Sequence, residues 1–527
     1  MPQRVKTKAS ATAIMFGGTM LSRILGFARD MLLAHLLGPV ADAFLVAFRL
    51  PNVFRRLLAE GSLGLASTAA FSRTAAAQGL SAAQQLCKDV LLLALLFSLP
   101  LTLVLALSAK PLIFLMAPGL AATPGLVSHT AALFQLCLPY LPLSFMAAIV
   151  FSARAGQGDF IPQALASSLF NICVLLAGLA ALAFSRDIIA TQYMLCFSVA
   201  LAGTAQLFIL GWKGLAGSPS LAPASTKTTP GPFRQALRNT DARAVLRRMP
   251  LASFGASVHQ LQVLVGVFLA SLLAQGSISA LYFAERLFEI PLGLAGVAIA
   301  VAAAPQLAEL AAHGDRQKFS AVLNKGFGIS LFLSLPAAAG LAGLAVPLAW
   351  LFFGHGAYGN EGAMHTASCL MAYAPGLPAM CAARPLLAAM AALGETRPAG
   401  IAACQSLLVA VFLGLVTMNL GPAGIALGIS AAAWCNTLLL LRILHRRGIP
   451  SPFSGCGKRL RLYILLSAAM ALALHALPLP TNERFMLAGL ICLLAGGCAF
   501  LWVFLFWAAS NPEARALMRL LRREKEK

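Results

Sequence analysis

The chain has 527 residues, of which 59% are hydrophobic and only 11% are charged. Soluble domains are about 45–50% apolar and about 25% charged, so this composition excludes an ordinary soluble domain and indicates a polytopic membrane protein. The net charge of +22 does not indicate nucleic-acid binding, because the basic residues lie mainly between apolar stretches and no DNA- or RNA-binding module is recognisable. We expect an all-α membrane protein with no nucleic-acid partner.

A helix that crosses a bilayer needs about 20 mostly apolar residues, and by this measure the sequence predicts about 14 transmembrane helices. The predicted spans are 11–36, 40–66, 89–116, 131–155, 160–184, 188–212, 246–274, 278–304, 325–353, 363–392, 398–419, 422–443, 460–478 and 485–508. Basic residues gather before the first span, after the sixth and twelfth, and in the C-terminal tail. The positive-inside rule therefore places both termini in the cytoplasm.

The first two predicted spans, which turn at Gly38–Pro39, hold an unusual set of charges. Five arginines and three acids lie between positions 21 and 61: Arg23, Arg29, Arg49, Arg55, Arg56, Asp30, Asp42 and Glu60. A charged side chain at the centre of a membrane helix costs about 2.5–3.5 kcal/mol, so these groups must face protein, water or a counter-ion. The excess of positive charge predicts a site for an anion.

Seven-residue spacings place several of these charges on one helical face. Arg23 and Asp30 are two turns apart, and Asp42 and Arg49 have the same spacing. We therefore expect a ladder of alternating charge toward the interior, with Arg29 and Arg55 set off from it. In the alternative interpretation, the arginines only lock helices together through ion pairs or extend to the lipid headgroups.

The segment Gly214–Asp241 is rich in Pro, Ser and Gly and divides six predicted spans from eight. A weak repeat extends across it, because Ala34–Leu50 aligns with Ala270–Leu287 with one gap and brings Arg49 onto Arg286. An even number of spans separates the two copies, so they share one orientation, as in transporters built from parallel repeats. We expect two lobes with a central cavity between them.

The second half of the chain adds further intramembrane charges. Arg286 and Glu289 are suitably spaced for a helical pair, with Glu285 beside them, and Arg384 lies directly before Pro385 in the tenth span. Guanidinium groups stay charged at any working pH and form forked hydrogen bonds with phosphate oxygens. The predicted ligand class is therefore phosphate or carboxylate.

Several predicted spans contain a proline or glycine that interrupts helices readily. In membranes such interruptions are tolerated where the released backbone groups line a cavity. We expect kinks near the cavity at Gly26, Pro51, Pro291, Pro375, Pro378 and Pro385.

No catalytic or metal-binding motif is recognisable. The sequence has no P-loop, no HExxH and no GxSxG pattern, and its eleven cysteines are scattered without metal-ligand spacing. We expect no enzyme activity, no metal and no cofactor, so transport would be driven by the membrane potential or an ion gradient.

The sequence resembles the MurJ (MviN) family of lipid II flippases, within the multidrug/oligosaccharidyl-lipid/polysaccharide exporter superfamily. The motifs that carry the resemblance are SRILGFARD, DAFLVAFRLPNVFRRLLAEG, YFAERLFEIPLGLAGVAIA and the later GETRPAG. The resemblance implies two six-helix lobes around a cationic cavity, followed by two helices that form a groove for the lipid tail. The implied domains are the N-lobe at 1–213, a cytoplasmic linker at 214–245, the C-lobe at 246–445, the groove helices at 446–510 and a basic cytoplasmic tail at 511–527.

Such a flippase moves lipid II, undecaprenyl-pyrophosphoryl-MurNAc-pentapeptide-GlcNAc, from the cytoplasmic to the periplasmic leaflet of the bacterial inner membrane by alternating access. The expected substrate-binding residues are Arg23, Arg29, Arg49, Arg55, Arg286 and Arg384. The expected supporting acids are Asp30, Asp42, Glu60, Glu285 and Glu289. The seventh, eleventh and twelfth spans, where some relatives bind sodium, offer only Gln260, Gln262, Gln405 and Asn436. This favours the membrane potential as the drive, and we expect a monomer whose partners are lipid II and membrane lipids.

Three alternatives stay open at this point. A flippase for another polyprenyl-pyrophosphate-linked glycan would need the same cationic cavity. A multidrug exporter would share the scaffold, although such exporters generally take cationic substrates. A membrane scaffold without transport activity would tolerate the loss of single intramembrane arginines.

Overall fold

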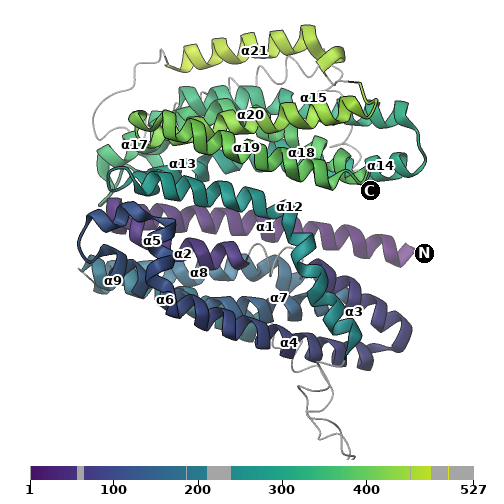
Figure 1. Ribbon diagram of the computed structural model, residues 1–527, viewed down its shortest axis with the longest axis horizontal. Helices are drawn as coiled ribbons and strands as arrows, with labels where there is room; N and C mark the ends of the chain where they lie inside the picture. The colour runs from purple at the N-terminus through teal and green to yellow at the C-terminus, as the bar shows by residue number, and fades with distance from the viewer. Residues whose placement is uncertain are drawn as a thin grey trace, which may run out of the picture. The chain divides into compact units, whose positions relative to one another are not determined.

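The computed structural model describes residues 2–55, 64–185, 187–210, 239–450, 453–475 and 496–497. In these residues every regular element is a helix and no strand occurs, which confirms the predicted all-α fold (Figure 1). Nine helical segments of this part of the chain are long and apolar enough to cross a membrane. Arg56, Glu60, nearly all of the predicted last span and the basic tail lie outside the described residues, so the total of 14 spans stays a prediction.

The chain divides into two compact units, Met1–Gln260 and Leu261–Lys527. The division falls within one long helix, α12 (Thr240–Ser271), which follows the predicted linker. Residues 214–238 of that linker lie outside the described residues. The predicted domain boundaries at 213 and 246 therefore stay predictions.

The first unit begins with a helical hairpin. The helices of this unit are α1 (Pro2–Leu37), α2 (Ala41–Phe54), α3 (Gly64–Gln78), α4 (Leu80–Leu107), α5 (Ala109–Met116), α6 (Leu126–Cys137), α7 (Tyr140–Gly156), α8 (Ile161–Phe184) and α9 (Ile188–Ala205), with the 3-10 helices η1 (Gly38–Val40) and η3 (Pro118–Ala122) and the π-helical segment η4 (Gln206–Leu210). The predicted turn between the first two spans is confirmed, because Gly38 has a φ of 55°. Glycine adopts this left-handed conformation without the steric penalty of a side chain.

Small residues set the contact between α1 and α8. A Cβ atom at Gly18 would lie 2.5 Å from the carbonyl oxygen of Ala164, and one at Gly178 would lie 2.7 Å from Leu32 Cδ2. Small residues at such positions let membrane helices approach closely. The helix α1 continues uninterrupted through Gly26, where the missing side chain makes room for Asn171 of α8.

The second unit packs its core among α14, α15, α18 and α20. Its helices are α13 (Ser277–Leu292), α14 (Ala298–Ala312), α15 (Arg316–Gly343), α16 (Ala345–Phe353), α17 (Gly359–Tyr373), α18 (Leu377–Ala392), α19 (Thr396–Val416), α20 (Pro422–Arg446) and α21 (Phe453–His475), with the π-helical segment η5 (Gly293–Val297) and the 3-10 helices η6 (Ala374–Gly376) and η7 (Met418–Leu420). Phe319 and Phe327 of α15, Leu386 of α18 and Leu440 of α20 are fully or almost fully buried in this core.

Side chains of α20 compensate for the break at η6. Because Pro375 has no N–H group, it leaves a carbonyl of the preceding turn without its helical donor. Ser430 Oγ donates to the carbonyl oxygen of Ala372 at 2.7 Å, and Trp434 Nε1 donates to that of Pro375 at 2.8 Å. The predicted interruption at Pro375 is thus confirmed, and its backbone groups are bonded to a neighbouring helix.

Two predicted spans were placed about nine residues too late. The third was expected at 89–116 and the ninth at 325–353, whereas α4 ends at Leu107 and α15 ends at Gly343. In each case one residue separates the long helix from a short apolar one, α5 or α16. Hydropathy alone does not distinguish such a pair from one continuous span.

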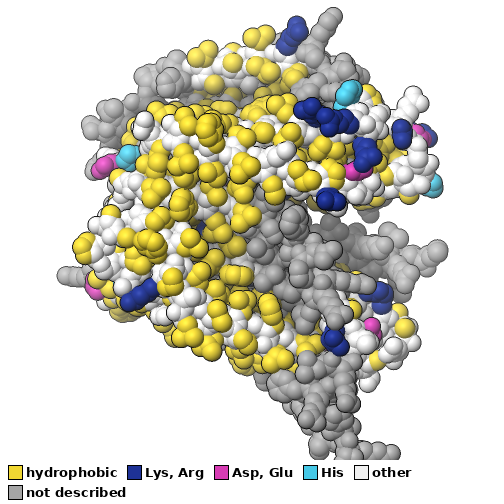
Figure 2. Space-filling view, in the orientation of Figure 1, with side chains coloured by type: hydrophobic (Ala, Val, Ile, Leu, Met, Phe, Trp, Pro, Cys, Tyr) yellow, Lys and Arg dark blue, Asp and Glu magenta, His cyan; other side chains and the backbone are white. Residues whose placement is uncertain are grey.

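The outer surface agrees with a lipid environment (Figure 2). Hydrophobic side chains cover the visible flanks of both units, and residues such as Leu176, Leu408 and Phe412 are more than 60% exposed. Most of the basic side chains visible on the second unit gather at one end, where α20 finishes. There Arg447 forms an ion pair of 2.6 Å with Glu395, which directly precedes α19.

Candidate functional site

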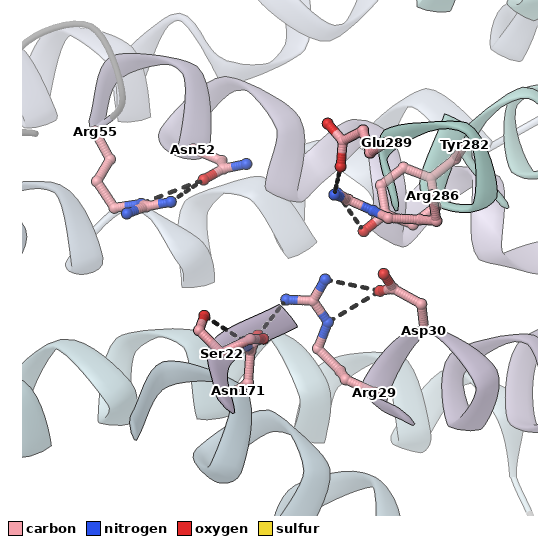
Figure 3. A network of polar contacts seen from close by, with 9 residues as sticks. All are labelled: Ser22, Arg29, Asp30, Asn52, Arg55, Asn171, Tyr282, Arg286 and Glu289. Atoms are coloured by element: carbon pink, nitrogen blue, oxygen red, sulfur yellow. Dashed lines mark hydrogen bonds and ion pairs between the residues drawn. The ribbon is translucent and has the colours of Figure 1, made fainter. Parts of the chain in front are cut away.

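Arg29 of α1 is buried and bonded to both its own helix and α8 (Figure 3). Its Nε and Nη2 atoms donate to Asp30 Oδ1 at 3.0 and 2.7 Å, and its Nη1 donates to Asn171 Oδ1 at 2.9 Å. Asn171 in turn donates to the carbonyl oxygen of Ser22 at 2.9 Å. The guanidinium carbon lies 5.9 Å from the centre of the Phe170 ring.

This arrangement corrects the expected charge ladder. Asp30 was expected on one face with Arg23, and Arg29 was expected to be offset from that face. In the structure the adjacent Arg29 pairs with Asp30, and Arg23 is exposed. Spacing along an ideal helix ignores the length of the arginine side chain, which is sufficient for it to bend back to its neighbour.

Arg286 of α13 is oriented by two residues of the same helix (Figure 3). Its Nη1 donates to Glu289 Oε2 at 2.8 Å, and its Nη2 donates to the hydroxyl oxygen of Tyr282 at 3.0 Å. Its guanidinium carbon also lies 4.6 Å from the centre of the Tyr282 ring. The predicted pair of Arg286 and Glu289 is confirmed. The side chain of Arg286 keeps 18% exposure.

Arg55 lies at the end of α2 and lines a cavity inside the first unit. Its Nε and Nη2 atoms donate to Asn52 Oδ1 at 3.2 and 2.8 Å. The cavity has a volume of about 220 Å³ and lies among α1, the end of α2, α7, α8 and η4. Its polar lining consists of Arg55, Tyr140, Ser144, Ser152, Gln163, Ser167 and Gln206.

The other predicted site residues lie at three further places. Asp42 is buried in α2 and Arg49 is half-buried two turns further along the same helix. Glu285 is half-buried next to Arg286. Arg384 is half-buried in α18, and its Cγ atom would lie 3.4 Å from a Cβ atom added at Gly296 of η5.

Sequence reasoning missed the neutral partners of the arginines. Asn171, Asn52 and Tyr282 each accept a hydrogen bond from a guanidinium group. Two of them were recognisable from spacing, since Asn52 precedes Arg55 by three residues and Tyr282 precedes Arg286 by four, which puts each pair on one helical face. Asn171 had only a weaker signal, as an amide in the middle of an apolar span.

The family model of the lipid II flippase MurJ matches residues 33–495. A probable lipid II flippase MurJ from Rhizobium meliloti (strain 1021) is 32% identical over 470 residues, which cover 88% of this chain and 85% of the relative. The chain belongs to the lipid II flippase MurJ family. The family predicted from the arginine-bearing motifs is thus confirmed, and it is a family of membrane transporters.

Solved structures agree with the family at the level of the fold. A lipid II flippase MurJ in an inward closed conformation matches with a TM-score of 0.74 at 22% identity, covering 93% of this chain and 98% of that chain. An inward-facing multidrug resistance MATE family transporter of the MOP superfamily matches with a TM-score of 0.60 at 16% identity, covering 88% and 98%. The predicted fold is confirmed. The roles of the single arginines stay predictions.

Proposed function

We propose that this member of the MurJ family moves lipid II from the cytoplasmic to the periplasmic leaflet of the bacterial inner membrane by alternating access. The diphosphate of the headgroup docks on guanidinium groups of Arg23, Arg29 and Arg286. Further positive charge along its path comes from Arg49, Arg55 and Arg384. Charge-assisted hydrogen bonds between guanidinium and phosphate are about twice as strong as neutral ones, and they can be bidentate.

One observation carries this proposal: Arg29 and Arg286 are both held by partners of the same chemical kinds. Each donates to one carboxylate and to one neutral oxygen, and each lies near an aromatic ring. Partners of this kind hold a binding group in one geometry before the ligand arrives. Asp30 and Glu289 therefore serve as positioning acids in the proposal, in the same manner for both units.

We also propose a membrane topology and an energy source for transport. Both termini lie in the cytoplasm, the chain acts as a monomer, and it has no enzymatic activity or cofactor of its own. Lipid II carries negative charge, so the membrane potential can act directly on the loaded carrier at about 2.3 kcal/mol per charge and 100 mV. Collapsing the potential with an ionophore should then slow translocation, whereas an unchanged rate would contradict this drive.

A depletion experiment tests the proposed substrate in intact cells. Acute inactivation of the chain should cause lysis and should remove lipid II from the outer surface, measured by its accessibility to an externally added lipid II-degrading enzyme. Reintroducing the wild-type chain should restore both, and an Arg286→Ala variant present at the same level should not. If inactivation abolished only a surface polymer and left lipid II accessible, another lipid-linked glycan would be the substrate.

A further inference from the structure

The cavity in the first unit has both polar and apolar walls, although it lies among hydrophobic helices. Tyr140, Ser144, Ala148 and Ser152 follow one another at four-residue intervals and therefore line one face of α7. Tyr140 is 1% exposed and Ser144 is 5% exposed. Polar groups at such depth in a membrane protein generally face other protein groups, water or a polar ligand.

The hydrogen-bond roles of the lining groups restrict what the cavity can hold. Ser144 Oγ donates to the carbonyl oxygen of Leu141 at 2.8 Å, and Ser152 Oγ donates to that of Ala148 at 2.7 Å. Gln206 Nε2 donates to the carbonyl oxygen of Ala166 at 2.7 Å. While these intrahelical bonds are kept, each serine hydroxyl has used its one donor, so the oxygens of Ser144 and Ser152 offer a ligand acceptors.

Acceptor oxygens disfavour a diphosphate as the occupant, because an ionised phosphate brings acceptors and no donors. A sugar brings hydroxyl and amide donors for these oxygens. Its C–H faces also match the apolar walls that Met15, Ala147 and Phe151 contribute to the same cavity. Arg55, at the edge of the cavity, supplies a cation for the phosphate attached to the first sugar.

The volume favours a small group. Drug-sized ligands occupy pockets of about 300–1,000 Å³, and this cavity has about 220 Å³. A cavity of this size suits a single sugar ring.

We propose that this cavity in the first unit is a subsite for one sugar ring of the lipid-linked headgroup, with Ser144 as an acceptor for a sugar donor. The inference rests on the proposed function, since it concerns the same substrate. It adds a means of selection beyond charge: the arginines bind the diphosphate common to all such lipids, and the cavity distinguishes glycosylated lipids from the bare diphosphate.

Equilibrium binding to the full-length protein in lipid nanodiscs tests the subsite. The probes are undecaprenyl diphosphate and the same lipid carrying MurNAc–GlcNAc, with and without the peptide. The wild-type chain should bind the peptide-free disaccharide lipid more tightly than the bare diphosphate. Ser144→Ala should weaken binding of both glycosylated probes about threefold to tenfold, as expected for one lost hydrogen bond, and should leave the bare diphosphate unaffected. Ala148→Leu, which fills the cavity, should act in the same direction.

Ser198→Ala is the matched control. Ser198 is 3% exposed and its hydroxyl donates to the carbonyl oxygen of Leu195 at 2.7 Å, as Ser144 does within its own helix, but it lies on α9 and does not line the cavity. This variant should bind all three probes as the wild type does.

Two results would overturn the subsite. One is equal weakening of all three probes by Ser144→Ala, and the other is a gain in affinity that requires the peptide and not the sugars. Failure of the proposed diphosphate docking would give a different result. In that case the wild type would bind undecaprenyl diphosphate no better than undecaprenol, while the difference between wild type and Ser144→Ala on the glycosylated probes would persist.

Discussion

The two units contain helices of similar length in the same order, but Arg29 of the first unit and Arg286 of the second are held by different contacts. The helices α4 and α5 have 28 and 8 residues, and α15 and α16 have 28 and 9. This parallel supports the weak sequence repeat, whose two copies end within α2 and α13. The described contacts of Arg29 join α1 to α8, whereas those of Arg286 stay within α13.

This difference in contacts indicates that Arg29 contributes to helix packing and that Arg286 contributes less to it. An arginine that bonds to two helices contributes to holding them together, so its loss should affect folding as well as transport. An arginine oriented by its own helix can be removed with less effect on packing. The loss of Arg29 and the loss of Arg286 should therefore have different consequences.

The largest effect is expected for Arg29→Ala. Removal of the guanidinium group deprives Asp30, which is 1% exposed, of its described cation. Breaking a buried pair in this way destabilises proteins by about 3–5 kcal/mol. The unfolding free energy of the purified chain in detergent should fall by an amount of this order, and lipid II translocation should be lost.

Arg286→Ala is the companion variant for this comparison. Its partner Glu289 has a side chain that is 36% exposed, so it can be solvated when the arginine is absent. We expect lost translocation with a much smaller change in unfolding free energy. Equal destabilisation by both variants would remove the distinction between the two units.

The next largest effect is expected at the contact between α1 and α8, the two helices that the bonds of Arg29 connect. Gly18→Ala would place a Cβ atom 2.5 Å from the carbonyl oxygen of Ala164, so α1 and α8 must move apart. Such overpacking costs about 1–3 kcal/mol. Gly17 has nothing within 4 Å of an added Cβ atom, so Gly17→Ala should be neutral or slightly stabilising. Thermal unfolding of the two variants measures the difference, and identical melting temperatures would contradict this account of the contact.

A third effect is expected where helices are interrupted, because the two units stabilise these places by different contacts. In the first unit Gly203 of α9 packs against Tyr140, where α7 begins, whereas in the second unit Ser430 of α20 bonds to the backbone preceding η6. Ser430→Ala should reduce the unfolding free energy by about 1 kcal/mol, because a buried carbonyl loses its donor. Ser368→Ala removes an exposed hydroxyl that bonds within its own helix, and it should have no measurable effect. If both variants unfolded alike, the bonds from α20 would not stabilise the break.

The smallest expected effect is a pH-dependent change in stability at the N-terminus of α15. Asp315 caps α15 by accepting from the backbone N–H of Lys318 at 3.1 Å, whereas Gly79 at the start of α4 provides no side-chain cap. The hydrogen bond from the Lys318 side chain, together with the backbone bond, lowers the pKa of Asp315 from its ordinary value of 3.8. Because the pKa is lower in the folded state, the charged carboxylate stabilises the fold above pH 3.8, and this stability is lost as the pH falls through the pKa of the folded state.

Asp315→Asn keeps an accepting oxygen for the cap but removes this charge. The wild type should therefore melt slightly higher than the variant at neutral pH, and the difference should vanish in acid below the folded pKa. A difference that stayed constant across this range would show that the charge of Asp315 does not contribute.

The sequence was sufficient to predict what depends on local pattern. The all-helical class, the turn at Gly38, the pair of Arg286 and Glu289 and the family were all recognisable from composition, spacing and motifs. The partner of Asp30 was not, because Arg29 and Arg23 are both within reach of it by sequence and only packing against α8 decides between them. The polar cavity was also missed, since Tyr140, Ser144 and Gln206 come from segments whose contact depends on tertiary structure.

In the proposed function, guanidinium groups inside the membrane bind the diphosphate of lipid II. The most direct measurement is the rate of lipid II translocation in reconstituted vesicles for wild type, Arg286→Lys and Arg286→Ala, each verified as folded. The account predicts no translocation for the alanine variant and a strongly reduced rate for the lysine variant, because lysine keeps the charge but lacks the forked donors. Wild-type translocation by folded Arg286→Ala would contradict it.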